Sequence, residues 1–244
     1  MSILKPAGER TVWQELGQAG KRAVPAFLAI GVVVVLLGLL ITKVLETTGF
    51  ADADAGVNRW FAKHRGSTLN TLTHLGTLFG ETITIVACTT ITVVIFRVVF
   101  HRWRESVILT ICVVGQSLIF LVTTILIDRE RPPVPHLDDS PPTSSFPSGH
   151  TAASTAYWVG TALIVAWHTR ERWLGTLITV VGLLIPIMVA TCRIYRGMHF
   201  PTDTTTSFLF ALALLAVAFR ALPLGEGSPD RSPDRRRAAS LRSG

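Results

Sequence analysis

The chain has 244 residues, of which 49% are hydrophobic and only 16% are charged. Soluble domains carry about 25% charged residues, and here the apolar residues gather into long uncharged runs, so the composition argues against ordinary soluble domains. The 23 Lys and Arg against 16 Asp and Glu give a formal net charge of +7, which suits a nucleic acid or the anionic face of a membrane. The apolar runs favour the membrane, and we expect no nucleic-acid partner.

Six of these runs predict helices that cross the bilayer, whose core, about 30 Å thick, needs roughly 20 apolar residues. The first follows basic residues, as in a signal peptide, but it is long and is followed by Lys43 instead of a cleavage site, so we expect a retained helix. The second extends toward Phe100 if the side chain of Arg97 reaches the headgroups. The six windows are 23–42, 82–96, 106–127, 151–167, 173–192 and 204–219. The predicted fold class is therefore all-α, a polytopic membrane protein with six transmembrane helices.

The basic residues predict the orientation, because cytoplasmic segments carry an excess of Lys and Arg. With the N-terminus inside, 15 of the 23 basic residues fall in cytoplasmic segments. We therefore expect a multi-pass protein of the cell membrane with both termini cytoplasmic and with loops 43–81, 128–150 and 193–203 outside. The predicted divisions are a cytoplasmic segment 1–22, a membrane domain 23–222 and a basic cytoplasmic tail 223–244, whose Ser, Pro, Asp and Arg content predicts disorder.

The first external loop contains an amphipathic stretch, which suits a helix lying in the plane of the membrane interface. We expect this stretch to serve packing or to form a wall for lipid entry. Its apolar positions are Val57, Trp60, Phe61, Leu69, Leu72, Leu75 and Phe79.

Residues with catalytic potential are concentrated in the second and third external loops, on one face of the membrane in the predicted topology. Guanidinium groups are forked, permanently charged donors that suit phosphate oxygens. Two histidines can divide the roles of nucleophile and general acid, and an aspartate can fix the tautomer of one of them. The candidates are Arg129, Arg131, Ser148, Gly149, His150, Arg193, Arg196, His199 and Asp203.

Two groups of these candidates stand where a helix is predicted to begin. Ser148 can cap the fourth predicted span, while Gly149 lets backbone N–H groups approach an anion at the positive end of the helix. Asp203 starts the last span four residues after His199, so the two side chains can face the same side of the helix start and form a hydrogen bond.

The remaining polar residues have simpler interpretations. A single arginine at a membrane boundary is commonly a headgroup anchor, and only the combined set at this spacing favours a catalytic site. Asp138 and Asp139 could suggest a metal, but no second carboxylate cluster or histidine spacing supports one. We therefore expect neither a metal nor a cofactor. Five histidines without a matching constellation are assigned to polar surface: His64, His74, His101, His136 and His168.

At the candidate residues the chain resembles the type 2 phosphatidic acid phosphatase (PAP2) superfamily, membrane lipid phosphatases that share a site with vanadium haloperoxidases. The family signature is Lys, six residues, Arg-Pro; then Pro-Ser-Gly-His; then Ser-Arg, five residues, His, three residues, Asp. Two positions depart from it, because Thr124 stands in place of the first-motif lysine and Cys192 precedes the third-motif arginine. The matching residues are Arg131, Pro132, Pro147, Ser148, Gly149, His150, Arg193, His199 and Asp203.

The resemblance implies a phosphatase that works without a metal. It implies that His199 attacks phosphorus while Asp203 holds its other ring nitrogen. His150 would protonate the leaving oxygen and then activate the water that hydrolyses the phosphohistidine. The phosphate oxygens would be held by Arg131, Arg193 and the backbone of Ser148 and Gly149. For the cation lost at Thr124, either Arg129 or Arg196 would replace it or the substrate would be bound differently.

A site at the outer membrane boundary favours a lipid substrate whose phosphate lies in the headgroup layer. Polyprenyl phosphate or diphosphate is preferred, because a short chain without an added soluble domain fits a bacterial enzyme that recycles a lipid carrier. Phosphatidic acid and phosphatidylglycerophosphate are alternatives. A different class is a non-catalytic lipid-phosphate binder or transporter, which Thr124 supports and the retained histidines and Asp203 oppose. A haloperoxidase is disfavoured because those relatives are soluble, and the sequence carries no signal of the oligomeric state.

Overall fold

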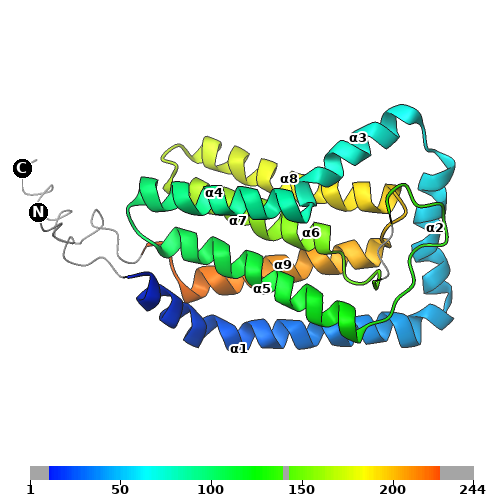
Figure 1. Ribbon diagram of the computed structural model, residues 1–244, viewed down its shortest axis with the longest axis horizontal. Helices are drawn as coiled ribbons and strands as arrows, with labels where there is room; N and C mark the ends of the chain where they lie inside the picture. Colours follow the sequence, from blue (N-terminus) through cyan, green and yellow to red (C-terminus); the bar gives the residue numbers. More distant parts are fainter. Residues whose placement is uncertain (1–10, 140–142, 226–244) are drawn as a thin grey trace, which may run out of the picture.

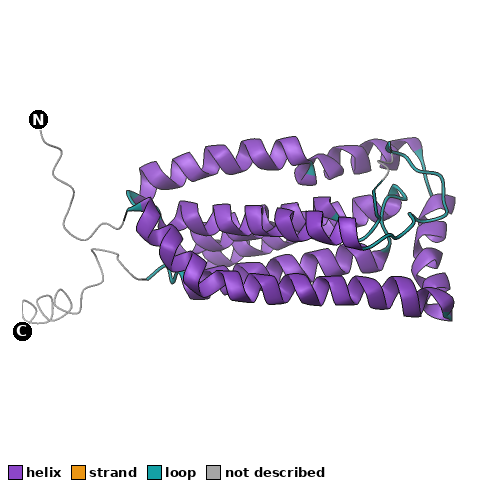
Figure 2. Cartoon of the chain, turned by 60° about the horizontal axis from the view of Figure 1, so that its bottom comes forward, coloured by secondary structure: helices purple, strands orange, loops and turns teal. Residues whose placement is uncertain are grey.

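A computed structural model describes residues 11–139 and 143–225 of the chain. Within these ranges every regular element is a helix and none is a strand (Figure 2). The elements in chain order are α1 (Val12–Leu39), η1 (Leu40–Val44), η2 (Leu45–Thr47), α2 (Gly49–Lys63), α3 (Ser67–Thr77), η3 (Leu78–Gly80), α4 (Thr82–Phe100), α5 (Arg104–Leu126), α6 (Gly149–Ser154), η4 (Thr155–Val159), α7 (Gly160–His168), α8 (Arg172–Tyr195) and α9 (Pro201–Ala221).

The all-helical membrane fold predicted from the sequence is confirmed. Five helices in the described part of the chain are long and apolar enough to cross a membrane. The remaining predicted window, 151–167, falls in α6, η4 and α7, which follow one another without a break over 149–168. A helix of this length spans about 30 Å, although the π-helical turn η4 divides it into three shorter elements.

The first helix begins earlier than its predicted span. It starts at Val12, where the Thr11 side chain accepts a hydrogen bond from the Gln14 N–H and the Gln14 side chain accepts one from the Thr11 N–H. This reciprocal capping satisfies N–H groups that a helix start leaves unpaired. The helix therefore extends from inside the predicted cytoplasmic segment 1–22, of which residues 1–10 lie outside the described part.

The helix formed by α6, η4 and α7 is the centre of the bundle, and α5, α8 and α9 pack around it (Figure 1). Small residues allow this close packing, since a Cβ on Gly182 of α8 would lie only 2.4 Å from the Cβ of Ala162. The outer helices instead expose large apolar side chains, such as Leu28 of α1 and Ile91 of α4. Large exposed apolar side chains are unfavourable in water but favourable against the hydrocarbon tails of a bilayer, so this surface suits contact with lipid.

The predicted amphipathic stretch of the first external loop forms two helices, α2 and α3. Figure 1 shows α2 lying across one end of the bundle and α3 leading back toward α4. Asp54 and Asn58 of α2 are buried against the bundle, whereas Trp60 is 56% exposed. The apolar positions of α3 also face outward, with Leu72 57% exposed. Such helices can lie in the headgroup layer.

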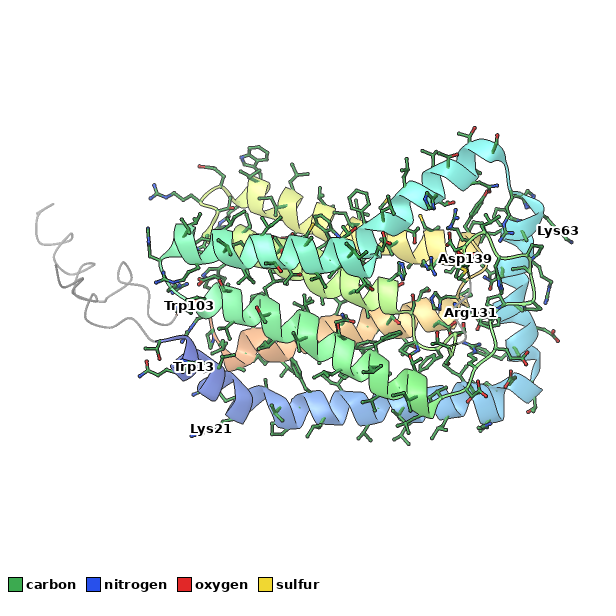
Figure 3. All side chains as sticks on the ribbon, viewed as in Figure 1. Trp13, Lys21, Lys63, Trp103, Arg131 and Asp139 are labelled. Atoms are coloured by element: carbon green, nitrogen blue, oxygen red, sulfur yellow. The ribbon has the colours of Figure 1, made fainter. Side chains whose placement is uncertain are left out.

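The bundle has two chemically different ends. Lys21 and Trp103 lie at one end, and Lys63, Arg131 and Asp139 lie at the other (Figure 3). Loops 128–150 and 193–203 therefore share one end with α2. The start of the predicted disordered tail is packed at the first end, where Arg104 donates to the Pro223 carbonyl and Arg102 to the Leu224 carbonyl. Tail residues 226–244 lie outside the described part.

We expect the loop that carries Arg131 and His150 to face the outside of the cell. In a variant without the three native cysteines, Glu130→Cys should react with a membrane-impermeant thiol reagent in intact cells, because Glu130 is exposed in that loop. The matched control is Glu171→Cys, exposed in the turn before α8 at the opposite end, which should react only after lysis. The reverse pattern of labelling would place the site in the cytoplasm.

Candidate active site

A cavity of about 570 Å³, here called the site cavity, lies at the end of the bundle that carries α2. Its polar part is lined by Arg131, Asp138, His150, Arg193 and His199. Its other part is apolar and lies between α4 and α5, where it is lined by Ile83, Val86, Val113 and Phe120. Ile83 and Val86 are largely exposed, so the apolar part reaches the outer surface of the bundle.

His199 lies in the short connection between α8 and α9, and its ring is almost completely buried. The ring Nδ1 lies 2.7 Å from the carbonyl oxygen of Ser145. Because a carbonyl can only accept, Nδ1 carries the proton of the neutral ring and Nε2 has the free electron pair. Burial lowers the pKa of His199, and the nearby carboxylate of Asp203 only partly opposes this effect. The ring is therefore neutral at neutral pH, with the electron pair of Nε2 available for a bond.

Asp203 occupies the first turn of α9 and is completely buried. Its Oδ2 accepts hydrogen bonds from the Ser145 hydroxyl at 2.5 Å and the Phe200 N–H at 2.8 Å, and its Oδ1 accepts one from Arg129. The distance from Oδ2 to Nδ1 of His199 is 3.7 Å. That exceeds a good hydrogen bond, so the Ser145 carbonyl is the immediate partner of the ring and Asp203 is the next group behind it.

Arg131 and Arg193 bring two guanidinium groups to the cavity from different elements. Arg193, near the end of α8, donates to Asp138 at 2.9 Å and to Thr77 at 3.2 Å, and Arg131 donates to the carbonyl of Met198 at 2.6 Å. The Nε of each arginine is buried and has no hydrogen-bond acceptor among the described residues. A buried donor without an acceptor costs about 1–3 kcal/mol. Two such donors beside one cavity indicate a site for an anion.

The segment Ser148 to His150 begins the central helix, and its members differ in access to the cavity. Gly149 and His150 line it, and a Cβ on Gly149 would lie 3.0 Å from the ring of Phe120. Ser148 is completely buried; its hydroxyl accepts from the Thr151 N–H, and its own N–H donates to the Ser207 hydroxyl at 2.7 Å. The cap expected at Ser148 is present, but its N–H is already occupied and its side chain does not line the cavity.

The comparisons with known proteins agree with this geometry. A model of the PAP2 superfamily matches residues 105–224. The chain belongs to the PAP2 superfamily. The crystal structure of the first transmembrane PAP2 type phosphatidylglycerolphosphate phosphatase from Bacillus subtilis superposes with a TM-score of 0.69, covering 83% of this chain and 98% of that one at 22% identity. That identity supports a shared fold. A search of curated protein sequences found no match.

Membership in the PAP2 superfamily makes this chain a membrane phosphatase. The residues that line the polar part of the cavity include one or more from each of the three PAP2 motifs: Arg131 from the first, His150 from the second, and Arg193 and His199 from the third. These motif residues are far apart in sequence and meet because loops 128–150 and 193–203 share one end of the bundle. Within the described ranges no group of three or more His, Cys, Asp or Glu is arranged to hold a metal ion.

We expected Arg129 or Arg196 to take the place of the missing PAP2 lysine. Neither lines the site cavity. Arg129 donates to Asp54 and Asp203 and stacks 4.1 Å from the centre of the Phe200 ring. Arg196 donates to both carboxylate oxygens of Asp138. The carboxylate partners of Arg129 thus lie outside the cavity lining, whereas Arg196 pairs with Asp138, which lines the cavity.

The two departures from the PAP2 signature have different surroundings. Thr124 lies on α5, one turn after the cavity-lining Phe120, and its buried hydroxyl has no partner among the described residues. Residues four apart share a helix face, so a lysine at this position would point along the side of α5 that lines the cavity. Cys192 packs against α3, since its sulfur lies 2.6 Å from a Cβ built on Gly76. The cysteine thus serves helix packing beside Arg193.

Several residues of the site were not found by sequence reasoning. Asp138, which we considered only as a metal ligand, lines the cavity and pairs with Arg193 and Arg196. Burial raises the pKa of Asp138, but the hydrogen bond from Arg196 and the neighbouring positive charges lower it below its usual range. Asn58 of α2 donates to the backbone carbonyl of His199 at 3.0 Å. No local motif marks these residues, because their partners lie far away in the chain.

Proposed function

We propose that this protein hydrolyses the phosphate ester or diphosphate of a membrane lipid in the site cavity, through a phosphohistidine on His199. The observation that carries the proposal is the meeting of two unsatisfied guanidinium donors, on Arg131 and Arg193, with the motif histidines in one cavity. These histidines are His150 and His199. The apolar part of the same cavity extends between α4 and α5 to the surface of the bundle. A lipid could thus place its phosphate at the histidines and its hydrocarbon chain toward the bilayer.

In the first step, the electron pair of His199 Nε2 forms a bond to phosphorus while the bond from phosphorus to the lipid oxygen breaks. His150 gives its proton to that oxygen, so that the lipid leaves as an alcohol or a monophosphate. Arg131 and Arg193 hold the equatorial oxygens, where charge concentrates in the transition state. Nδ1 of His199 keeps its proton, which the Ser145 carbonyl accepts as a hydrogen bond.

In the second step, the now neutral His150 takes a proton from a water molecule, whose oxygen attacks phosphorus. The bond between phosphorus and Nε2 breaks, and its electron pair returns to His199. Inorganic phosphate leaves together with the proton from His150, and His150 is protonated again when the next phosphate binds. The cycle balances without an oxidant, a reductant or a cofactor.

Binding of the phosphate should raise the pKa of His150, so that the ring carries the proton that it donates as an acid. Burial has the largest effect on the pKa of His150 and the positive charge of Arg193 the next largest, and together they lower it to about 3. The ring is therefore neutral in the free site at neutral pH. An anion between the two arginines offsets their charge and favours the protonated ring. We expect the pKa of His150, followed by NMR of ¹⁵N-labelled histidine and assigned with His150→Ala, to rise when vanadate binds. An unchanged or lower pKa would remove His150 from the role of acid.

For the substrate, we propose polyprenyl phosphate or diphosphate in the recycling of a bacterial lipid carrier, with the site on the outer side of the cell membrane. The apolar part of the site cavity supports a long hydrocarbon chain. Phosphatidylglycerophosphate is the second candidate, because the solved Bacillus subtilis protein of the same fold is a phosphatidylglycerolphosphate phosphatase. Phosphatidic acid is the third member of the panel to be tested.

The decisive assay uses purified protein in detergent, with a chelator present, against these lipid phosphates. We expect release of inorganic phosphate that vanadate inhibits, since vanadate mimics five-coordinate phosphorus, and the rank order of kcat/KM identifies the substrate. Binding of the lipids without phosphate release from any of them would instead support a non-catalytic lipid-phosphate binder. Activity that requires an added metal would contradict the mechanism.

A further inference from the structure

Ser145 is completely buried and contacts two residues of the third PAP2 motif, His199 and Asp203. Its carbonyl oxygen is 2.7 Å from His199 Nδ1, and its hydroxyl donates to Asp203 at 2.5 Å. Its backbone N–H donates to the carbonyl of Arg129 at 2.8 Å. All three polar groups of Ser145 are therefore used, and two of them contact the nucleophile and its carboxylate.

The carboxylate of Asp203 is satisfied without the imidazole ring. Its Oδ1 accepts from Arg129, and its Oδ2 accepts from Ser145 and from the Phe200 N–H. The ring nitrogen of His199 is 3.7 Å away, beyond the range of a good hydrogen bond. The carboxylate and the ring thus share no hydrogen bond with each other, but each forms one with Ser145.

A second carboxylate holds this arrangement from the side of α2. One terminal guanidinium nitrogen of Arg129 donates a hydrogen bond to Asp203. The other terminal nitrogen donates one to Asp54 of α2 at 2.9 Å. Asp54 also accepts hydrogen bonds from the side chain and the N–H of Thr202. Buried ion pairs of this kind hold a geometry when their remaining hydrogen bonds are satisfied. Arg129 therefore fixes Asp203 in place and is not available to the phosphate.

We propose that Ser145 is a positioning residue, through which Asp203 acts on His199, and that Arg129 and Asp54 hold Asp203 for this purpose. The inference rests on the proposed phosphohistidine chemistry. When Nε2 bonds to phosphorus, the ring becomes positively charged and Nδ1–H donates more strongly to the Ser145 carbonyl. The charge of Asp203, whose Oδ2 lies 3.7 Å from Nδ1, stabilises that ring, and the Ser145 hydroxyl holds the carboxylate in this place. No proton moves to Asp203.

A double-mutant cycle of Ser145→Ala and Asp203→Asn tests the connection kinetically. Ser145→Ala should lower kcat by about tenfold, the scale of one hydrogen bond to a charged group, and leave KM unchanged because Ser145 does not line the site cavity. The double variant should be little slower than Asp203→Asn alone, because both substitutions break the same connection. The matched control is Ser144→Ala, whose hydroxyl bonds to the backbone of Arg129 and Phe146 and whose effect should add to that of Asp203→Asn. Full additivity of Ser145→Ala would overturn the proposal.

The tautomer of His199 provides a readout that does not depend on activity. In ¹⁵N-histidine NMR, assigned with His199→Ala, the proton should stay on Nδ1 in Asp203→Asn, because the Ser145 carbonyl still accepts it. Movement of the proton to Nε2 in Asp203→Asn would show a direct contact with Asp203 and overturn the proposal. If the wild type hydrolyses no lipid of the panel, the proposed function fails, while this spectrum still decides which group holds the ring.

Discussion

His199→Ala should reduce turnover to background, a loss of about 10⁴-fold or more, because it removes the nucleophile and with it the covalent route. Incubation with labelled substrate should leave an acid-labile phosphoryl group on the wild type and none on this variant. The matched control is His64→Ala, which removes an exposed histidine near the end of α2, outside the site cavity. It should keep both the rate and the adduct.

The second site histidine should give a different result. His150→Ala should slow the release of an alkyl leaving group by about 10²- to 10⁴-fold, the usual contribution of a general acid. The deficit should shrink for an activated aryl phosphate, whose leaving group needs no proton. Wild-type hydrolysis by His199→Ala, or an equal deficit of His150→Ala on both substrates, would overturn the assignment of roles.

Arg193→Lys should lower kcat/KM by about 10²- to 10³-fold, the scale of one lost transition-state donor, although the charge is kept. One terminal nitrogen of Arg193 donates to both Thr77 and Asp138, and the Nε has no acceptor among the described residues. A point ammonium cannot keep these contacts and also present the remaining guanidinium N–H groups to an anion. The expected loss should also appear as weaker inhibition by vanadate. Kinetics and inhibition of the purified variant in detergent provide the measurement.

Arg172→Lys is the matched control for this substitution. Arg172 is exposed at the start of α8, so it lies on the same helix as Arg193 but at the opposite end of the bundle. Its replacement should leave kcat/KM and vanadate inhibition unchanged, and both variants should unfold near the wild-type temperature. An active Arg193→Lys with undiminished vanadate affinity would show that charge alone is sufficient at this position.

The membrane fold followed directly from the sequence, because the length of an apolar run is a local property. Five of the six predicted windows lie wholly within helices of the structure, and the window 106–127 ends one residue beyond α5. Local patterns were less informative about helix ends and turns. Capping by Thr11 and Gln14 starts α1 ahead of its apolar window, and contacts of Arg104 and Arg102 hold Pro223 and Leu224, which composition assigned to the disordered tail.

The sequence by itself also determined which residue types belong to the site, since the spacing of the PAP2 motifs is written in the chain. Only the tertiary structure decided which of them reach the cavity. Arg131 and Arg193 do so, whereas Arg129 and Arg196 do not line it and pair with Asp54 and Asp138. A pairing between residues far apart in the chain leaves no local signal, so guanidinium groups that look equivalent in sequence cannot be told apart.

The partner of His199 shows the same limit most clearly. Spacing places Asp203 one turn from His199, and the structure places the Ser145 carbonyl 2.7 Å from Nδ1 of the ring, nearer than that carboxylate at 3.7 Å. A backbone carbonyl is present in every residue, so the side-chain sequence does not mark the one that fixes a tautomer. The folding of loop 128–150 against the start of α9 decides it, because only there do the Ser145 hydroxyl and carbonyl meet their two partners at once.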